Sequence, residues 1–160
     1  MMKRCNRFLF ALMLLVGLSG CGSPGYMVKP IEVMTNKAEV VIVKDDKTRE
    51  GFLQTMEDWL SEHHYVYKVV NSGSKHDLSQ LTLEYEGLWR WDLALYLQDA
   101  EIKAYQQGQK VGEVDFHVPY TMNPSKFGDA EKRIRLMMAA LFGKISAEDA
   151  TKIANSSEKY

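Results

Sequence analysis

Residues 81–97 read LTLEYEGLWRWDLALYL, and apolar and polar side chains alternate over most of this stretch. Alternation with a period of two is typical of a β-strand with one buried and one solvated face. Glu86-Gly87 interrupts the stretch and predicts a turn, although this pair is not among the preferred hairpin residues. After that turn, one face of the strand collects the large apolar side chains of Trp89, Trp91, Leu93, Leu95 and Leu97. We therefore expect an antiparallel sheet whose apolar face packs on helices.

The alternation changes phase just beyond this stretch. Ala100, Ile102 and Ala104 are the next apolar positions, so the apolar residues move from odd to even numbers. A period of two that slips by one residue requires an extra residue in the strand, which predicts a bulge or tight bend at Gln98-Asp99. Residues 106–109 then predict a turn into a last strand with an apolar inward face.

The segments on both sides supply the remaining elements. Ala38 to Val43 predicts a buried strand, and residues 65–70 predict another. Apolar residues at helical spacing predict one amphipathic helix between these strands and a second that begins at Asn123-Pro124 and stops at Gly143. Four basic residues are expected on the solvent side of the second helix: Lys126, Lys132, Arg133 and Arg135.

These elements define the fold class. We predict an α+β protein with a mostly antiparallel sheet of about five strands and the chain order β-α-β-β-β-β-α. Two amphipathic helices pack on one face of the sheet, and Ser146 opens a short C-terminal helix through a capping box.

The N-terminal residues have the pattern of a bacterial lipoprotein leader. Lys3, Arg4 and Arg7 precede an apolar run of about ten residues, which is short for a membrane span of roughly 20. The run closes on the lipobox residues Leu18, Ser19, Gly20 and Cys21. We predict that Cys21 receives lipid after cleavage. The alternatives are an uncleaved N-terminal anchor and an ordinary signal peptide cut near Gly20.

The domain organisation follows from this leader. Residues 1–20 are the expected signal peptide, 21–37 the lipidated Cys21 and a flexible tether, 38–145 the α+β domain, and 146–160 a short helix and a frayed tail. A tether of about 16 flexible residues spans roughly 20–25 Å. Gly22, rather than Asp, after the lipidated residue resembles outer-membrane sorting in Gram-negative bacteria, so the domain is expected on the periplasmic side of the outer membrane.

Composition excludes some classes of function. Without the leader, 17 basic residues face 21 acidic ones, and a net negative chain does not suit nucleic acid. Cys5 belongs to the leader and Cys21 to the anchor, so we expect neither a disulfide nor thiol chemistry in the domain. We also expect no cofactor.

The candidate catalytic and metal-binding residues are few. The histidines are His63, His64, His76 and His117, and they lack metal-ligand spacing or an acidic cluster beside them. No Gly-x-Ser-x-Gly motif is present. We therefore predict neither a metal site nor an enzyme. A hydrolase remains a third option that requires one of the histidines beside a serine or carboxylate in a cleft.

The most distinctive candidate site is the polar face of the long strand. Alternation places Arg90, Asp92, Tyr96, Lys103 and Tyr105, with Glu101, on the face that no helix is expected to cover. Charged residues interleaved with tyrosines suit a modest protein interface. An open sheet also leaves edges that can pair with another strand.

A resemblance to a known family rests on three segments: Trp91-Asp92-Leu93-Ala94-x-Tyr96, Ala100-Glu101-Ile102 and Val111-Gly112-Glu113. The chain resembles a small family of uncharacterised proteobacterial outer-membrane lipoproteins over most of the predicted domain. The resemblance implies a lipoprotein of the Gram-negative envelope and no catalytic or ligand residues. The layout is also similar to small α+β domains of lipoproteins that assist envelope machines, an analogy of fold alone.

The leading hypothesis is a non-catalytic, lipid-anchored protein whose domain binds or supports another envelope component. Its partners would be the membrane, through the anchor, and an envelope protein of unknown identity. The alternative is a small-ligand or lipid-binding domain with an apolar cavity between the sheet and the helices, lined by Phe52 and Trp59.

Overall fold

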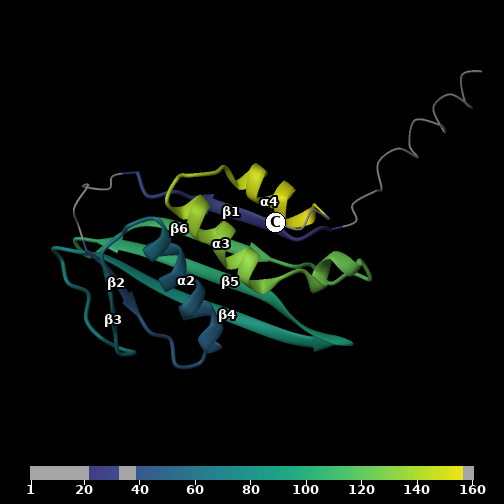
Figure 1. Cartoon of the computed structure of the whole chain (residues 1–160), viewed down its shortest axis with the longest axis horizontal. Coiled ribbons are helices and arrows are strands. Elements are labelled where there is room, and N and C mark those ends of the chain that lie inside the picture. The colour runs from purple at the N-terminus through teal and green to yellow at the C-terminus, as the bar shows by residue number, and fades with distance from the viewer. Residues whose placement is uncertain (1–21, 33–38, 157–160) are drawn as a thin grey trace, which may run out of the picture.

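The structure is a computed structural model that describes residues 22–32 and 39–156. These residues form six strands, three α-helices and a short 3-10 helix (Figure 1). The strands are β1 (Gly25–Lys29), β2 (Val40–Val43), β3 (Tyr67–Val70), β4 (Leu81–Asp92), β5 (Ala94–Gln106) and β6 (Gln109–His117). The helices are α2 (Glu50–Glu62), η1 (Pro124–Phe127), α3 (Ala130–Leu141) and α4 (Ala147–Asn155).

The six strands form one mixed sheet in the order β1-β6-β5-β4-β2-β3. Strands β1, β6, β5 and β4 pair antiparallel, whereas β2 pairs parallel with both β3 and β4. The parallel half follows from the connection through α2, because two parallel neighbours need a long crossover. The α+β class is confirmed. The sheet has one strand more than we expected, and it is mixed.

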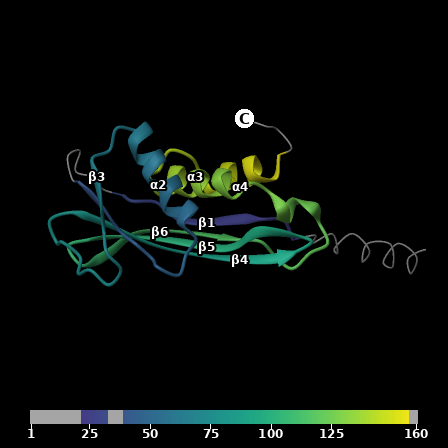
Figure 2. The same ribbon diagram turned by 60° about the horizontal axis from the view of Figure 1, so that its bottom comes forward.

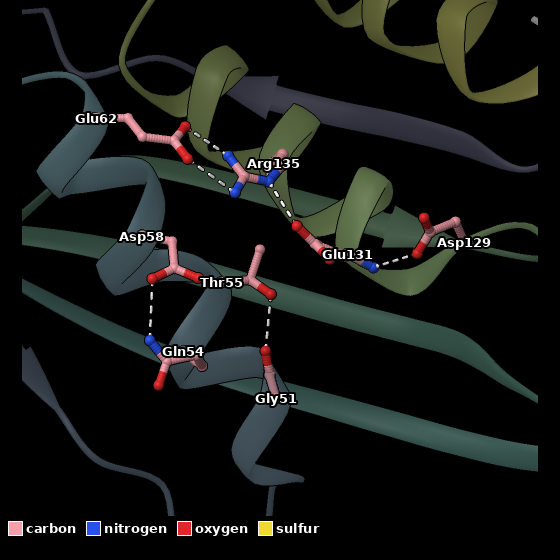
Figure 3. A network of polar contacts seen from close by, with 8 residues as sticks. All are labelled: Gly51, Gln54, Thr55, Asp58, Glu62, Asp129, Glu131 and Arg135. Carbon is pink, nitrogen blue, oxygen red and sulfur yellow. Dashed lines mark hydrogen bonds and ion pairs between the residues drawn. The ribbon is translucent and has the colours of Figure 1, made fainter. Parts of the chain in front are cut away.

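Helices and sheet form two layers. Figure 2 shows α2, α3 and α4 together on one face of the sheet. Side chains without solvent exposure fill the space between the layers, including Phe52 and Met56 of α2, Met137 of α3 and Ile102 of β5. Helices α2 and α3 lie side by side, and Arg135 joins them through two hydrogen bonds to Glu62 of 2.7 and 3.1 Å (Figure 3).

The turn predicted at Glu86-Gly87 is wrong. Strand β4 continues through both residues, and the chain reverses at Leu93, which has a φ of 62°. Gly87 serves packing, because a Cβ atom there would lie 2.7 Å from the Trp89 ring and 2.9 Å from the Phe52 ring. The glycine that suggested a turn thus makes room for two aromatic rings inside a strand. A leucine at the turn gives no sequence signal.

The predicted bulge is confirmed. Leu88 pairs with Asp99 and Trp89 pairs with Leu97, so Gln98 is the extra residue in β5. The carbonyl of Gln98 accepts a hydrogen bond of 2.8 Å from the amide of Val118. The extra residue is one of the two, Gln98 and Asp99, at which the phase of the alternation predicts a bulge.

The flexible tether predicted over residues 21–37 is wrong for the part that the structure describes. Gly25–Lys29 is an edge strand, β1, that pairs with β6 from Gly25↔His117 to Lys29↔Glu113. Tyr26 is buried, and its hydroxyl donates to the carbonyl of Arg133 at 3.2 Å. The strand has five residues and is flanked by glycine and proline, so its alternation is too short to be recognised in the sequence. Residues 1–21 and 33–38, which include the predicted lipobox, lie outside the described residues.

Helix α4 belongs to the domain rather than to a tail. Its N-cap, Ser146, accepts from the amide of Asp149, which confirms the predicted start of the helix at Ser146. The helix covers β1, because Thr151 Oγ1 accepts from the amide of Tyr26 at 3.1 Å and Asn155 Nδ2 donates to the carbonyl of Pro24 at 2.8 Å. The first strand and the last helix therefore close the fold together.

Candidate functional site

The sheet face opposite the helices carries charged residues in register. On β4, β5 and β6, Glu84, Lys103 and Glu113 form one cross-strand row. The neighbouring row is Glu86, Glu101 and Asp115. We call these six residues the outer face. Five carboxylates accompany one lysine, so this part of the surface is acidic.

Ion pairs offset only part of this charge. Lys103 pairs with Glu101 at 2.7 Å, and Lys110 pairs with Glu113 at 2.6 Å. The hydrogen bond from Lys110 lowers the pKa of Glu113. Burial, followed by the charges of Glu101 and Glu113, raises the pKa of Asp115. The row Glu86, Glu101, Asp115 therefore places carboxylates against each other across three strands, an arrangement that is destabilising by itself.

Loop 71–80 borders one end of the outer face. His76 Nε2 lies 2.8 Å from Glu84 Oε1, and the His76 ring lies 4.7 Å from the ring of Tyr105. Beside this contact lies an open pocket of about 250 Å³ at the ends of β2 and β3, lined by Val43, Lys44, Asp45, Ser72, Gly73, Glu84, Tyr85, Glu86, Glu101 and Lys103. The Asp45 carboxylate in this pocket already accepts from the Thr48 amide and hydroxyl, at 3.0 and 2.6 Å.

Segment 119–128 borders the other end. Arg90 Nη1 donates to the Tyr120 hydroxyl at 2.6 Å, and Asp92 forms an ion pair with Lys126. The ring of Tyr96 packs edge to face against Phe127, with centroids 5.6 Å apart. The chain itself therefore contacts the polar side chains at this end of the hairpin.

These contacts divide the interaction face predicted from the sequence. Arg90 and Asp92 are exposed but engaged by segment 119–128, and Tyr96 is 6% exposed and belongs to the core. Lys103 lies in the centre of the outer face, and Tyr105 lies beneath His76. Tyr96 was placed wrongly because segment 119–128, distant in sequence, covers its strand position. Lys103 and Tyr105 lie on the face we predicted.

A buried cation holds segment 119–128 in place. Arg133 is 2% exposed, although we expected it in solvent. Its Nη1 donates to the carbonyls of Leu97 and Lys126, each at 3.1 Å, and its Nη2 donates to the carbonyl of Ser125 at 2.7 Å. Burial lowers the pKa of Arg133. Lys126 is also buried, at 7% exposure. Helical spacing does not indicate either burial, because backbone carbonyls hold Arg133 and the carboxylate of Asp92, on another element, holds Lys126.

Some apolar residues that we expected in the core lie at the exposed hairpin turn instead. Trp89 and Leu97 pair across β4 and β5 and pack inward, but Trp91, Leu93 and Leu95 are 73%, 85% and 47% exposed. The predicted single strand is a hairpin, so its middle residues project beyond the helices. We call Trp91, Leu93 and Leu95 the hairpin tip.

Two histidines pair with carboxylates. Besides His76 with Glu84, His117 Nδ1 lies 2.5 Å from Asp99 Oδ1. His63 Nδ1 instead lies 2.8 Å from the carbonyl of Trp59, at the end of α2. His76 and His117 each form a hydrogen bond with a carboxylate. Among the described residues, no serine hydroxyl contacts either imidazole ring. In residues 22–32 and 39–156, no group of three or more His, Cys, Asp or Glu could hold a metal ion.

The residues expected to line an apolar cavity pack against other aromatic rings. Phe52 stacks on Tyr85 with centroids 5.0 Å apart and meets Trp89 edge to face at 6.2 Å. Trp59 is 3% exposed and lies between His63, Tyr65 and Phe142. Around these two side chains, rings fill the space that a ligand would need.

None of the helices in the described part of the chain is long and apolar enough to cross a membrane. A scan of the chain against protein-family models finds no matching family, and no curated protein matches it. The resemblance to outer-membrane lipoproteins stays a prediction from the sequence.

Proposed function

We propose that this chain is a non-catalytic, lipid-anchored protein of the bacterial envelope whose domain binds another envelope component through the outer face. The observation that carries the proposal is the one-sided architecture. All three α-helices of the described chain pack on one face of the sheet, and the acidic rows on β4, β5 and β6 face away from them.

The charge of the outer face defines the partner that would fit. The raised pKa of Asp115 reflects burial and repulsion from neighbouring carboxylates. A cationic group placed over Glu86, Glu101 and Asp115 would relieve this repulsion, so a partner with lysine or arginine side chains gains from the contact. Complementary charge of this kind contributes more to association rate and specificity than to affinity.

The membrane address rests on the sequence of the leader. Leu18-Ser19-Gly20-Cys21 follows a basic and then an apolar segment, which supports lipid attachment to Cys21. Stable membrane anchoring needs two signals, such as two acyl chains, and the several acyl chains that bacterial lipoproteins carry on this cysteine exceed that number. The outer membrane is the expected location, with the domain on its periplasmic side.

The proposed membrane localisation is tested by comparing the native chain with Cys21→Ser in cells that receive labelled palmitate. The native chain should incorporate label and sediment with membranes, and Cys21→Ser should do neither. Retained labelling and membrane association in Cys21→Ser would remove the lipid-anchor proposal.

The binding proposal is tested by charge reversal in crosslinked envelopes. Glu101→Lys with Asp115→Lys should abolish recovery of a crosslinked partner by the anchored full-length chain. The matched control reverses two exposed carboxylates away from the outer face, Glu32→Lys with Glu148→Lys, and should leave recovery unchanged. Equal recovery with both double variants, or no partner with the native chain, would contradict binding through the outer face.

A further inference from the structure

The chain enters the domain beside the hairpin tip. A Cβ atom on Gly22 would lie 2.8 Å from Cγ of Pro119, and Gly25 pairs with His117 at the end of β6. Pro119 is adjacent to Tyr120, whose hydroxyl accepts from Arg90 of the hairpin. Figure 1 shows the start of β1, the end of β4 and η1 at the same end of the molecule. Gly22 and the hairpin tip therefore share one end.

Exposed apolar side chains gather at this end. The described residues contain ten large hydrophobic side chains with substantial exposure, and six of them belong to residues 88–95 and 120–122. They are Leu88, Trp91, Leu93, Leu95, Tyr120 and Met122. Met122 is 95% exposed and Tyr120 is 79% exposed. Apolar patches of this kind on a soluble surface mark contact with a protein or a membrane.

We propose that the hairpin tip and residues 120–122 insert into the surface of the lipid bilayer to which Cys21 anchors the chain. This inference rests on the lipid anchor of the proposed function. The occupant follows from where the described chain begins, because Cys21 precedes Gly22 directly and consecutive Cα atoms lie about 3.8 Å apart. An acylated Cys21 would hold the Gly22 end of the domain against the lipid headgroups.

The side chains at this end suit the headgroup region. Tryptophan and tyrosine have an apolar body and a polar group, and they concentrate at membrane–water boundaries. The charged groups beside the hairpin tip have partners within the fold, since Asp92 pairs with Lys126 and Arg90 donates to the Tyr120 hydroxyl. Insertion should therefore depend on apolar contact and take place on uncharged phosphatidylcholine, without a requirement for anionic lipid.

Trp91 makes the inference directly measurable. The other two tryptophans are Trp59, which is buried, and Trp89, which packs against Phe52. The full-length, lipidated chain is reconstituted into phosphatidylcholine vesicles, and tryptophan quenching by acyl-brominated phosphatidylcholine is recorded. Native protein should be quenched at least threefold more than Trp91→Phe, because only Trp91 would reach the acyl chains.

The matched control moves the fluorophore to the opposite end of the sheet. Leu78 is 61% exposed and lies 3.5 Å from the position of a Cβ atom on Gly108, in the turn between β5 and β6. Trp91→Phe combined with Leu78→Trp should show no more quenching than Trp91→Phe alone. Unchanged circular dichroism would show that both variants retain the fold.

The outcomes separate the inference from the proposed function. Native protein that fails to float with vesicles, while Cys21→Ser behaves identically, would overturn the anchor and the insertion together. Native protein that floats but shows the same quenching as Trp91→Phe would overturn insertion alone. Protection of Trp91 from aqueous acrylamide in native envelopes but not in lipid vesicles would identify a protein occupant and refute insertion into lipid.

Discussion

Replacement of Arg133 by methionine tests how the fold positions segment 119–128. Three backbone carbonyls, of Leu97, Ser125 and Lys126, accept from the guanidinium. A Cβ atom on Gly128 would lie 2.8 Å from Nη2, so the segment closes tightly around the cation. Methionine retains most of the apolar stem but donates no hydrogen bond, and thereby isolates the polar contribution.

The expected loss is a difference between two large effects. A hydrogen bond with a charged partner contributes about 1.5–3 kcal/mol, so three of them contribute at least about 4.5 kcal/mol. Arg133 is 2% exposed, and removal of a buried charge recovers several kcal/mol of desolvation. We expect Arg133→Met to lower the free energy of unfolding by about 2 kcal/mol. Arg133→Ala also loses packing on Phe116, whose ring centroid lies 4.9 Å from Cζ, and should lose about 4 kcal/mol.

The assay combines urea denaturation with hydrogen exchange. Circular dichroism gives the free energy of unfolding, and exchange of the Lys126 and Gly128 amides reports on the segment itself. Arg133→Lys is the control, because an ammonium keeps the charge but lacks the planar fork that reaches three carbonyls. A loss below 0.5 kcal/mol in Arg133→Met, with native exchange rates, would refute the conclusion that these hydrogen bonds hold the segment.

Four further predictions concern single side chains. Asp115→Asn should raise the free energy of unfolding at pH 7 by about 0.5 kcal/mol, and this gain should vanish as the pH falls through the raised pKa of Asp115, where the native carboxyl takes up its proton first. Thr48→Val should cost about 1–2 kcal/mol because the Gly87 amide loses its acceptor at 2.9 Å, whereas Thr82→Val, which removes a buried hydroxyl without a partner among the described residues, should cost nothing; equal losses in denaturant would contradict this. Burial raises the pKa of Asp45, but the hydrogen bonds that its carboxylate accepts from Thr48 and Lys47 lower this pKa by more. The free energy of unfolding should therefore fall as the pH drops through the lowered pKa, and Asp45→Asn should flatten this part of the pH profile. Leu93→Asn should raise the thermal midpoint, since asparagine tolerates a φ of 62° and the strain to be relieved is about 1 kcal/mol; a lowered midpoint would contradict it.

Local patterns predicted those parts of the fold whose causes are local. The phase change of the alternation located the bulge at Gln98-Asp99, and the Ser146 cap located the start of α4. The turn after β5 also appears where Gln107 and Gly108 have positive φ. The sequence signal for each of these features comes from residues that are close together in the chain.

The incorrect predictions share a different origin. Strand β1 exists because β6 and α4 cover Tyr26 from positions about 90 and 125 residues away. Arg133 is buried because three carbonyls converge on it, one from Leu97 in β5 and two from Ser125 and Lys126 in η1. No periodicity of the surrounding sequence encodes such partners. The candidate site inherited the same error, because segment 119–128 covers Tyr96.

Leu93 connects the incorrect turn with the proposed membrane contact. A β-hairpin of this kind favours glycine or asparagine where φ is positive, and leucine there sacrifices stability of about 1 kcal/mol. Leu93 is also 85% exposed and sits between Trp91 and Leu95, which are exposed as well. Strain and apolar exposure at one residue, without a compensating contact inside the described chain, are expected where a residue serves function rather than folding. Insertion into lipid would provide the missing compensation, because the bilayer would remove from water the side chain that the fold leaves exposed.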